Sequence, residues 1–260
     1  MGISRLQLQV VALLAMLSVF LLILSTPIAI LVERGFNLEG LTADFIRALL
    51  LSLLSSLLSA SINVLLAAPL SFYISRRLRG RSRRALYSIL MLPAILTPSA
   101  TGSLLLLFFT LNPVGAFINN HVNIVNSVKG VVLANLVVAF PTALAYLAGL
   151  FMSVPRVYEE LAMEAGMGPL SFIYKVLFPM LKRELSICYL LTFSRAFSDF
   201  GASLILGGGI RGRTWTLPIL IYATTYMGGY VAVSTIILIY VALGLAINYF
   251  LSGLEEGPRW

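Results

Sequence analysis

Apolar residues run in long, nearly unbroken stretches along the chain, and polar residues gather in short segments between them. Each stretch is long enough to cross a hydrocarbon core of about 30 Å as a helix that rises about 1.5 Å per residue. The stretches cover residues 8–32, 48–75, 85–110, 130–152, 184–206 and 229–251. They do not alternate apolar and polar positions, as the strands of a membrane barrel do. The pattern predicts an all-α integral membrane protein with six transmembrane helices.

Composition supports this prediction. Hydrophobic residues make up 59% of the 260 residues, and the mean hydropathy is +0.97, more than a soluble core of this size could bury. The first stretch is longer than a typical secretory signal core and lacks a small-residue cleavage pattern, so we expect a retained helix. Cys188 is the only cysteine, which excludes a disulfide within the chain and a thiolate metal site.

The basic residues predict the orientation. With a cytoplasmic N terminus, twelve Lys and Arg residues fall in inner segments and five in outer loops, and RRLRGRSRR at 76–84 supplies six of the twelve. This asymmetry predicts that both termini are cytoplasmic. The cluster could instead bind nucleic acid or anionic lipid, but a positive-inside anchor explains it, so we expect lipid and no nucleic acid as a partner. An aromatic belt at the outer interface is predicted from Trp215, Tyr222, Tyr226 and Tyr230.

The polar segment between the fourth and fifth stretches has a pattern of its own. Residues 159–179 read EELAMEAGMGPLSFIYKVLFP, in which apolar residues at helical spacing form one stripe and the glutamates lie largely elsewhere. Gly166 and Gly168 interrupt this helix, Pro169 suits the first turn of a second one, and its stripe ends at Pro179. Two short amphipathic helices of this kind fit either a groove on another protein or the bilayer surface.

A resemblance favours the first alternative. The segment resembles the cytoplasmic EAA loop of binding-protein-dependent ABC importer permeases through Glu160, Ala162, Gly166 and, thirteen residues after that glycine, Pro179. The resemblance implies a type I ABC importer permease fold, in which residues 156–182 dock into an ATPase subunit and Pro169 belongs to the same coupling surface. Leu161 departs from the family, which usually has a second alanine there.

The same resemblance, over about residues 48–251, implies the organisation of the chain. Residues 1–47 form a first helix and an outer loop, 48–251 the permease domain with a coupling loop at about 153–183, and 252–260 a short cytoplasmic tail. The chain has no G-x-x-x-x-G-K-[ST] loop, so ATP and Mg are expected in the partner ATPase, with no cofactor and no catalysis in this subunit. One set of helices makes half of a two-sided pathway, so a second permease subunit is also expected, either a second copy in a homodimer or a sister permease, together with an extracytoplasmic solute-binding protein.

Two charges lie in the fifth stretch. Arg195 and Asp199 are four residues apart, and each would cost about 2.5–3.5 kcal/mol near the bilayer centre. They could pair with each other, line a gate or pathway, or lie nearer the interface than the stretch suggests. Around them, SRAFSDFGASLIL at 194–206 resembles the fifth-helix signature of molybdate, tungstate and sulfate permeases, which commonly carry glutamate at the position of Asp199. TWTLPILIY at 214–222 resembles the segment that follows it in those permeases.

The outer loop gives a different indication of the substrate. Its triple glycine, Gly207, Gly208 and Gly209, resembles the equivalent loop of thiamine and ferric-iron permeases. Three glycines suit a re-entrant or moving loop, or an ordinary turn. Arg211 and Arg213 could attract an anion or contact a binding protein, or simply be solvated.

The third stretch combines prolines with hydroxyls. LPAILTPSATGSLLLLF at 92–108 contains Pro93 and Pro98, which free backbone carbonyls and kink a membrane helix. The hydroxyls of Thr97, Ser99 and Thr101 could offer an oxyanion weak, distributed donors along a pathway. Small-residue helix packing explains the same residues.

Two other classes of protein remain to be weighed. A membrane enzyme is disfavoured because Asp199 is the only acidic residue well inside a stretch and His121 is the only histidine. An ATP-independent channel or secondary transporter would be expected to carry more intramembrane charge or an inverted repeat. The loop at 156–182 favours a permease that is coupled to a separate motor.

Overall fold

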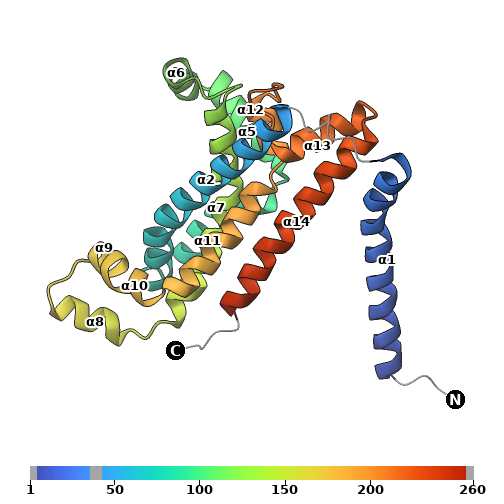
Figure 1. Ribbon diagram of the computed structural model, residues 1–260. Coiled ribbons are helices and arrows are strands. Elements are labelled where there is room, and N and C mark those ends of the chain that lie inside the picture. Colours follow the sequence, from blue (N-terminus) through green and yellow to red (C-terminus); the bar gives the residue numbers. More distant parts are fainter. Residues whose placement is uncertain (1–4, 36–42, 256–260) are drawn as a thin grey trace. The chain divides into compact units, whose positions relative to one another are not determined.

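The computed structural model describes residues 5–35 and 43–255, and every regular element in these ranges is helical (Figure 1). Residues 1–4, 36–42 and 256–260 lie outside the described residues, and with them parts of the predicted outer loop and cytoplasmic tail. The elements are α1 (Arg5–Arg34), α2 (Ala43–Arg76), α3 (Gly80–Leu90), α4 (Leu92–Ile95), α5 (Pro98–Leu111), α6 (Pro113–Val122), α7 (Val128–Ser153), α8 (Val157–Glu164), α9 (Pro169–Phe172), the π-helix η2 (Ile173–Leu177), α10 (Phe178–Met180), α11 (Lys182–Phe197), α12 (Gly201–Gly207), α13 (Leu217–Tyr226) and α14 (Tyr230–Glu255).

The chain divides into two compact units. One combines α1 with residues 221–243, and the other contains residues 43–220 and the end of α14 from Gly244. All the sequence-predicted site residues lie in the second unit. By length and composition, four described helices could cross a membrane, or five if α5 and α6, which meet at 87°, count as one bent span.

Two of the six predicted stretches are not continuous helices. The stretch at 85–110 is divided between α3, α4 and α5, because Pro93 and Pro98 cannot donate to the preceding turn. Leu96 and Thr97 are extended there, with ψ of 147° and 149°. The stretch at 184–206 is interrupted between α11 and α12, at residues 198–200. Both breaks correct the sequence-based spans, and both lie beside predicted pathway residues.

α2 and α7 run parallel and are joined along their length by hydrogen bonds from side chains to backbone. The donors lie on one stripe of α2, at multiples of four residues, and each acceptor is the carbonyl 73 positions further along the chain. The bonds join Ser59 to Val132 (2.9 Å), Asn63 to Leu136 (3.0 Å), Ser71 to Leu144 (3.0 Å) and Ser75 to Ala148 (3.1 Å). A constant offset requires parallel helices, as the predicted topology does for its second and fourth spans.

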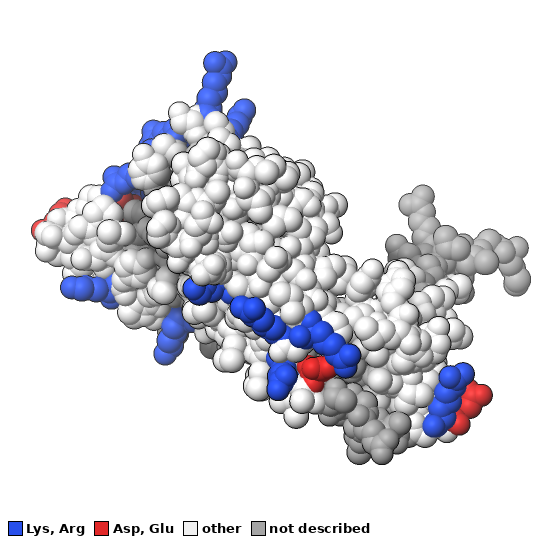
Figure 2. Space-filling model, turned by 90° about the horizontal axis from the view of Figure 1, so that it is seen from above, with Lys and Arg blue, Asp and Glu red and all other residues white. Residues whose placement is uncertain are grey.

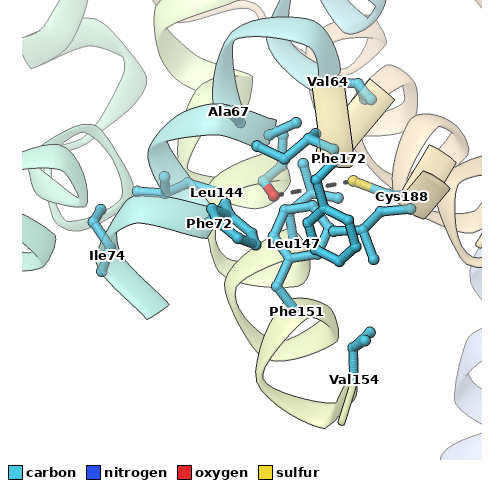
Figure 3. Close-up of a cluster of buried hydrophobic side chains, with 14 of the residues drawn as sticks. Val64, Ala67, Phe72, Ile74, Leu144, Leu147, Phe151, Val154, Phe172 and Cys188 are labelled. Carbon is cyan, nitrogen blue, oxygen red and sulfur yellow. Dashed lines mark hydrogen bonds between the residues drawn. The ribbon is translucent and has the colours of Figure 1, made fainter. Parts of the chain in front are cut away.

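The largest hydrophobic cluster joins these two helices to the 156–182 loop and to α11 (Figure 3). At its centre, the Phe72 ring meets the edges of Phe151 and Phe172, with ring centroids 6.0 and 5.9 Å apart. Edge-to-face pairs of this kind add to the burial of apolar area. Because Phe172 belongs to α9, the loop is part of the core.

Large apolar side chains also cover much of the outside. Leu54 and Leu65 of α2 and Leu104 of α5 are each more than half exposed. Figure 2 shows that most of the face seen from above is uncharged, with Lys and Arg gathered in a few places. Exposed leucines such as these suit hydrocarbon as the solvent.

Candidate functional site

The 156–182 loop presents its motif residues in opposite directions. Ala162 is 7% exposed and packs in the core cluster, whereas Leu161 is 57% exposed and Glu160 is also exposed. The motif alanine therefore anchors α8, while the glutamate and the leucine form an outward surface. Leu161, the departure from the family pattern, lies on that surface and leaves the anchoring contact unchanged.

Gly166 ends α8 with a turn that favours glycine. Its φ is +77°, in the left-handed region, where a Cβ is disfavoured. The Gly166 amide donates to the Met163 carbonyl and the Met167 amide to the Ala162 carbonyl, both at 2.9 Å. These two bonds form a Schellman motif, which satisfies the free carbonyls at the helix end. The glycine thus sets the angle between α8 and α9.

The two prolines of the loop have separate structural roles. Pro169 occupies the first turn of α9, where the missing N–H costs nothing. Pro179 follows η2, in which the Phe178 amide donates to the Ile173 carbonyl five residues earlier. A π-turn is wider than an α-turn and often marks a functional site. Here it accommodates a proline that has no N–H for the carbonyl of Lys175.

Two arginines of the 76–84 cluster contact the ends of this loop. Arg77 forms an ion pair with Glu159 of α8 at 2.9 Å. Arg76 donates to the carbonyls of Phe151 and Val154, where α7 leads into the loop. Sequence reasoning treated the whole cluster as a membrane anchor and missed these contacts, because the partners are far apart in the chain.

Arg195 and Asp199 do not form the ion pair that their spacing allowed. α11 ends at Phe197, so Asp199 lies in the break before α12 and not on the same helix as Arg195. The Asp199 carboxylate, 2% exposed, instead accepts from the Ser203 amide at 2.8 Å and meets the Ser203 hydroxyl at 2.6 Å. Among the described residues, its other oxygen, Oδ1, has no hydrogen-bond partner.

The same serine extends the contact into a buried polar network. Ser203 Oγ lies 2.9 Å from Asn135 Oδ1 on α7, and Asn135 Nδ2 donates to Ser55 Oγ on α2 at 3.0 Å. All three side chains are buried. Buried polar groups are costly unless they are bonded, so the network fixes how α2, α7 and α12 meet. Asn135, Ser203 and Ser55 were not predicted from the sequence.

The predicted hydroxyls have different surroundings. Thr97 caps α5 by accepting from the Ala100 amide at 3.2 Å, and Thr101 is buried and donates to the Thr97 carbonyl at 3.2 Å. Ser99 and Thr97 are exposed. Thr101 therefore serves the helix itself, whereas Ser99 and Thr97 retain exposed surface.

α5 and α12 cross at very short range. A Cβ on Gly201 would lie 2.5 Å from Ser99 Oγ and 2.7 Å from its backbone nitrogen, and one on Gly102 would lie 2.7 Å from the Cα of Ala202. Only glycine permits this approach. The structure thus places Ser99, one of the predicted pathway residues, beside α12, the helix that follows Asp199.

The triple glycine forms a packed turn. Gly208 and Gly209 have φ of +78° and +55°, and the Trp215 indole donates to the Gly209 carbonyl at 2.7 Å. A Cβ on Gly208 would meet Asn126 Oδ1 at 2.2 Å. These geometries explain Gly208 and Gly209 without a moving loop, and Gly207 ends α12.

The two outer-loop arginines differ. Arg211 forms an ion pair with Asp44 at the start of α2, at 2.8 Å, and lies 5.8 Å from the centre of the Trp215 ring. Arg213 is exposed. Arg211 thus ties the turn to α2, although its side chain is itself 67% exposed.

Comparison with known proteins relates this arrangement to a family. Residues 62–257 match the family described as binding-protein-dependent transport system inner membrane component. The probable transport system permease protein NifC of Clostridium pasteurianum is 31% identical over 186 residues, which cover 71% of this chain and 64%, just under two thirds, of that protein. The molybdenum transport system permease protein ModB of Mycobacterium tuberculosis is 32% identical over 77% of this chain and 76% of its own. The sulfate transport system permease protein CysW of Escherichia coli K12 is 28% identical over 68% of this chain and 62% of its own.

Solved structures share the fold. A bacterial alginate ABC transporter, crystallised with a periplasmic protein that holds an alginate pentasaccharide, matches 98% of this chain and 96% of its own with a TM-score of 0.72 at 18% identity. A crystal structure of a bacterial ABC transporter involved in alginate import matches with a TM-score of 0.70 at 17% identity. At these identities the likeness concerns the fold alone.

Proposed function

This chain belongs to the family of binding-protein-dependent transport system inner membrane components and has the fold of a type I ABC importer permease, and from this premise we propose that it imports a tetrahedral oxyanion, molybdate or tungstate, with sulfate as the nearest alternative. The substrate class rests chiefly on two relatives that are 32% and 28% identical and are named molybdenum and sulfate permeases. The segments at 194–206 and 214–222 support the same class.

The position of Asp199 is compatible with an anionic substrate. A carboxylate that lined the pathway would repel an oxyanion, whereas this one is 2% exposed and bonded to Ser203. The exposed hydroxyls of Thr97 and Ser99 at the break before α5 could donate to oxyanion oxygens. Weak, distributed donors permit release as well as entry.

The energy would enter through the 156–182 loop. In the proposed mechanism, two ATPase subunits, which hold the ATP and Mg, bind the outward surface of Glu160 and Leu161 on each of two permease copies. ATP-driven closure of the ATPases would move α8 and turn the central cavity toward an extracytoplasmic binding protein, and hydrolysis would reset it. This arrangement places the loop, the 76–84 cluster and both termini in the cytoplasm.

The experiment combines ligand binding with transport. We expect a solute-binding protein to be encoded beside this chain and to bind molybdate and tungstate in calorimetry. Proteoliposomes with permease, ATPase and binding protein should accumulate molybdate only with ATP. Binding of thiamine or ferric iron alone would transfer the assignment to the relatives suggested by the triple glycine. Accumulation without the ATPase would replace the importer with a channel or secondary transporter.

A further inference from the structure

The 156–182 loop is bound to α2 at two separate points. The first is the ion pair between Arg77, the residue directly after the end of α2, and Glu159 in the first turn of α8, at 2.9 Å. The Glu159 side chain is only 14% exposed and that of Arg77 42%. The pair therefore lies partly sheltered from water, where a charge-assisted hydrogen bond is stronger than at an open surface.

The second point involves the other half of the loop. The Tyr174 hydroxyl, on η2, donates to the Leu65 carbonyl of α2 at 2.9 Å. Leu65 lies four residues before Pro69, which has no N–H, so this carbonyl lacks its usual helical donor. Tyr174 supplies the missing donor. A tyrosine hydroxyl carries its proton at physiological pH in any case, and burial raises the pKa of Tyr174 further in that direction.

α2 is in turn fastened to α7. Four side chains of α2 donate to α7 carbonyls along the length of the pair, and Arg76 extends the series to the carbonyls of Phe151 and Val154. The loop follows directly from Val154. One end of the loop thus begins near the end of α7, while α8 contacts Arg77 just after α2 and η2 contacts α2 itself.

We propose that α2 is the helix through which the loop passes its movement into the membrane core, with Arg77 and Tyr174 as the positioning residues of that connection. The proposal rests on the proposed function, in which an ATPase subunit binds the 156–182 loop. The chain turns at Gly166, between α8 and α9. A movement of α8 therefore reaches the membrane helices only if the segments before and after this turn are both fixed to them. Arg77 holds the first half and Tyr174 the second, so a push on α8 moves α2 and, through the hydrogen-bond series, α7.

The functional test uses the assembled transporter. We expect Arg77→Gln and Tyr174→Phe each to leave ATPase co-purification unchanged and to lower molybdate uptake per ATP hydrolysed about two- to five-fold, from the usual strengths of such contacts. Exchange of the charges, Arg77→Glu with Glu159→Arg, should restore most of the loss. Arg79→Gln is the matched control, because Arg79 is exposed and forms no ion pair in the described part of the chain. Unchanged coupling in the Arg77→Gln, Tyr174→Phe double variant would overturn the proposal.

A second measurement does not depend on the substrate or the ATPase. In a Cys188→Ala background, spin labels at Leu161 and Tyr73, which are 57% and 50% exposed, report the separation of α8 from α2 in the purified permease. We expect one narrow distance distribution, broadened in the double variant and unchanged by Arg79→Gln. An equally narrow distribution in the double variant would show that these contacts do not hold the loop. If the distances behave as expected but the wild-type permease fails to bind an ATPase, the proposed function is wrong and the connection remains.

Discussion

Gly166 shows how a single residue can be required by geometry. Its positive φ and its two Schellman hydrogen bonds set the angle between α8 and the rest of the loop, yet a Cβ there would meet nothing within 4 Å. The constraint is therefore conformational and not steric. Gly168, two residues on, has φ of −74° and equally open space. The two glycines form a natural pair for comparison.

Substitutions at Gly166 and Gly168 test whether the positive φ, and not a lack of space for a Cβ, is what requires a glycine. We expect Gly166→Ala to destabilise the turn by about 1–2 kcal/mol and to lower ATPase activity stimulated by the binding protein, because the left-handed backbone disfavours a Cβ. Gly166→Pro should abolish stimulation, since proline fixes φ near −65° and cannot donate to Met163. Gly168→Ala should have little effect. Full stimulation in Gly166→Pro would mean that the turn has no part in coupling.

Glu160 offers a second test at the level of the residue. Its side chain is exposed, and neighbouring Ala162 anchors the helix, so Glu160→Lys should preserve insertion and thermal stability. We expect loss of ATPase co-purification, because the charge on the outward surface is reversed. Arg213→Glu, a charge reversal at an exposed residue of the predicted outer loop, is the control. Equal co-purification of the ATPase with Glu160→Lys and the wild type would move the docking surface elsewhere.

At the scale of elements, the breaks in the helices matter more than their lengths. The break before α5 exposes Thr97 and Ser99, and the break before α12 turns Asp199 into the core. The two helices that follow these breaks cross where Gly102 and Gly201 allow their backbones to touch. The predicted pathway residues therefore do not share one surface. Thr97 and Ser99 are exposed, whereas Asp199 is buried.

The crossing predicts a specific loss of stability. A Cβ at Gly102 would lie 2.7 Å from the backbone of Ala202, which cannot move aside as a flexible side chain could. We expect Gly102→Ala to lower the free energy of unfolding by about 1–3 kcal/mol, measured as a lower melting temperature in detergent. Gly149→Ala, where the Cβ meets nothing within 4 Å inside helix α7, should be neutral or stabilising by up to about 1 kcal/mol. A melting temperature that is the same for both variants would contradict this account.

At the scale of the whole molecule, two independent observations constrain the direction of the helices. The constant offset between α2 and α7 makes them parallel, and the Arg77–Glu159 pair places the 76–84 cluster beside the 156–182 loop. Neither observation says which side of the membrane is cytoplasmic. The positive-inside asymmetry supplies that assignment as a prediction.

Labelling in whole cells tests the assignment. In a Cys188→Ala background, a membrane-impermeant thiol reagent should not reach cysteines at the exposed positions Ser82 and Glu164, and it should label one at Arg213. The reagent should reach the first two only after the cells are opened. Labelling of Glu164→Cys in intact cells would place the loop outside and exclude a cytoplasmic ATPase as its partner.

The sequence by itself determined the membrane class, the helical fold and most helix positions, because these depend on local spacing and on apolar run length. Spacing also predicted two short amphipathic helices at 156–182, and only the resemblance to a known family identified them as an EAA loop. The sequence also identified Pro93 and Pro98 as places where carbonyls lose their donors, although not which groups replace them, and it did not single out Pro69 of α2. Only the tertiary structure decided that Asp199 bonds to Ser203 and not to Arg195, and that Arg77 and Tyr174 hold the loop. Those contacts depend on the offset between α2 and α7 and on where α11 ends. Such distances between remote residues are set by packing of the whole unit, which no local pattern records.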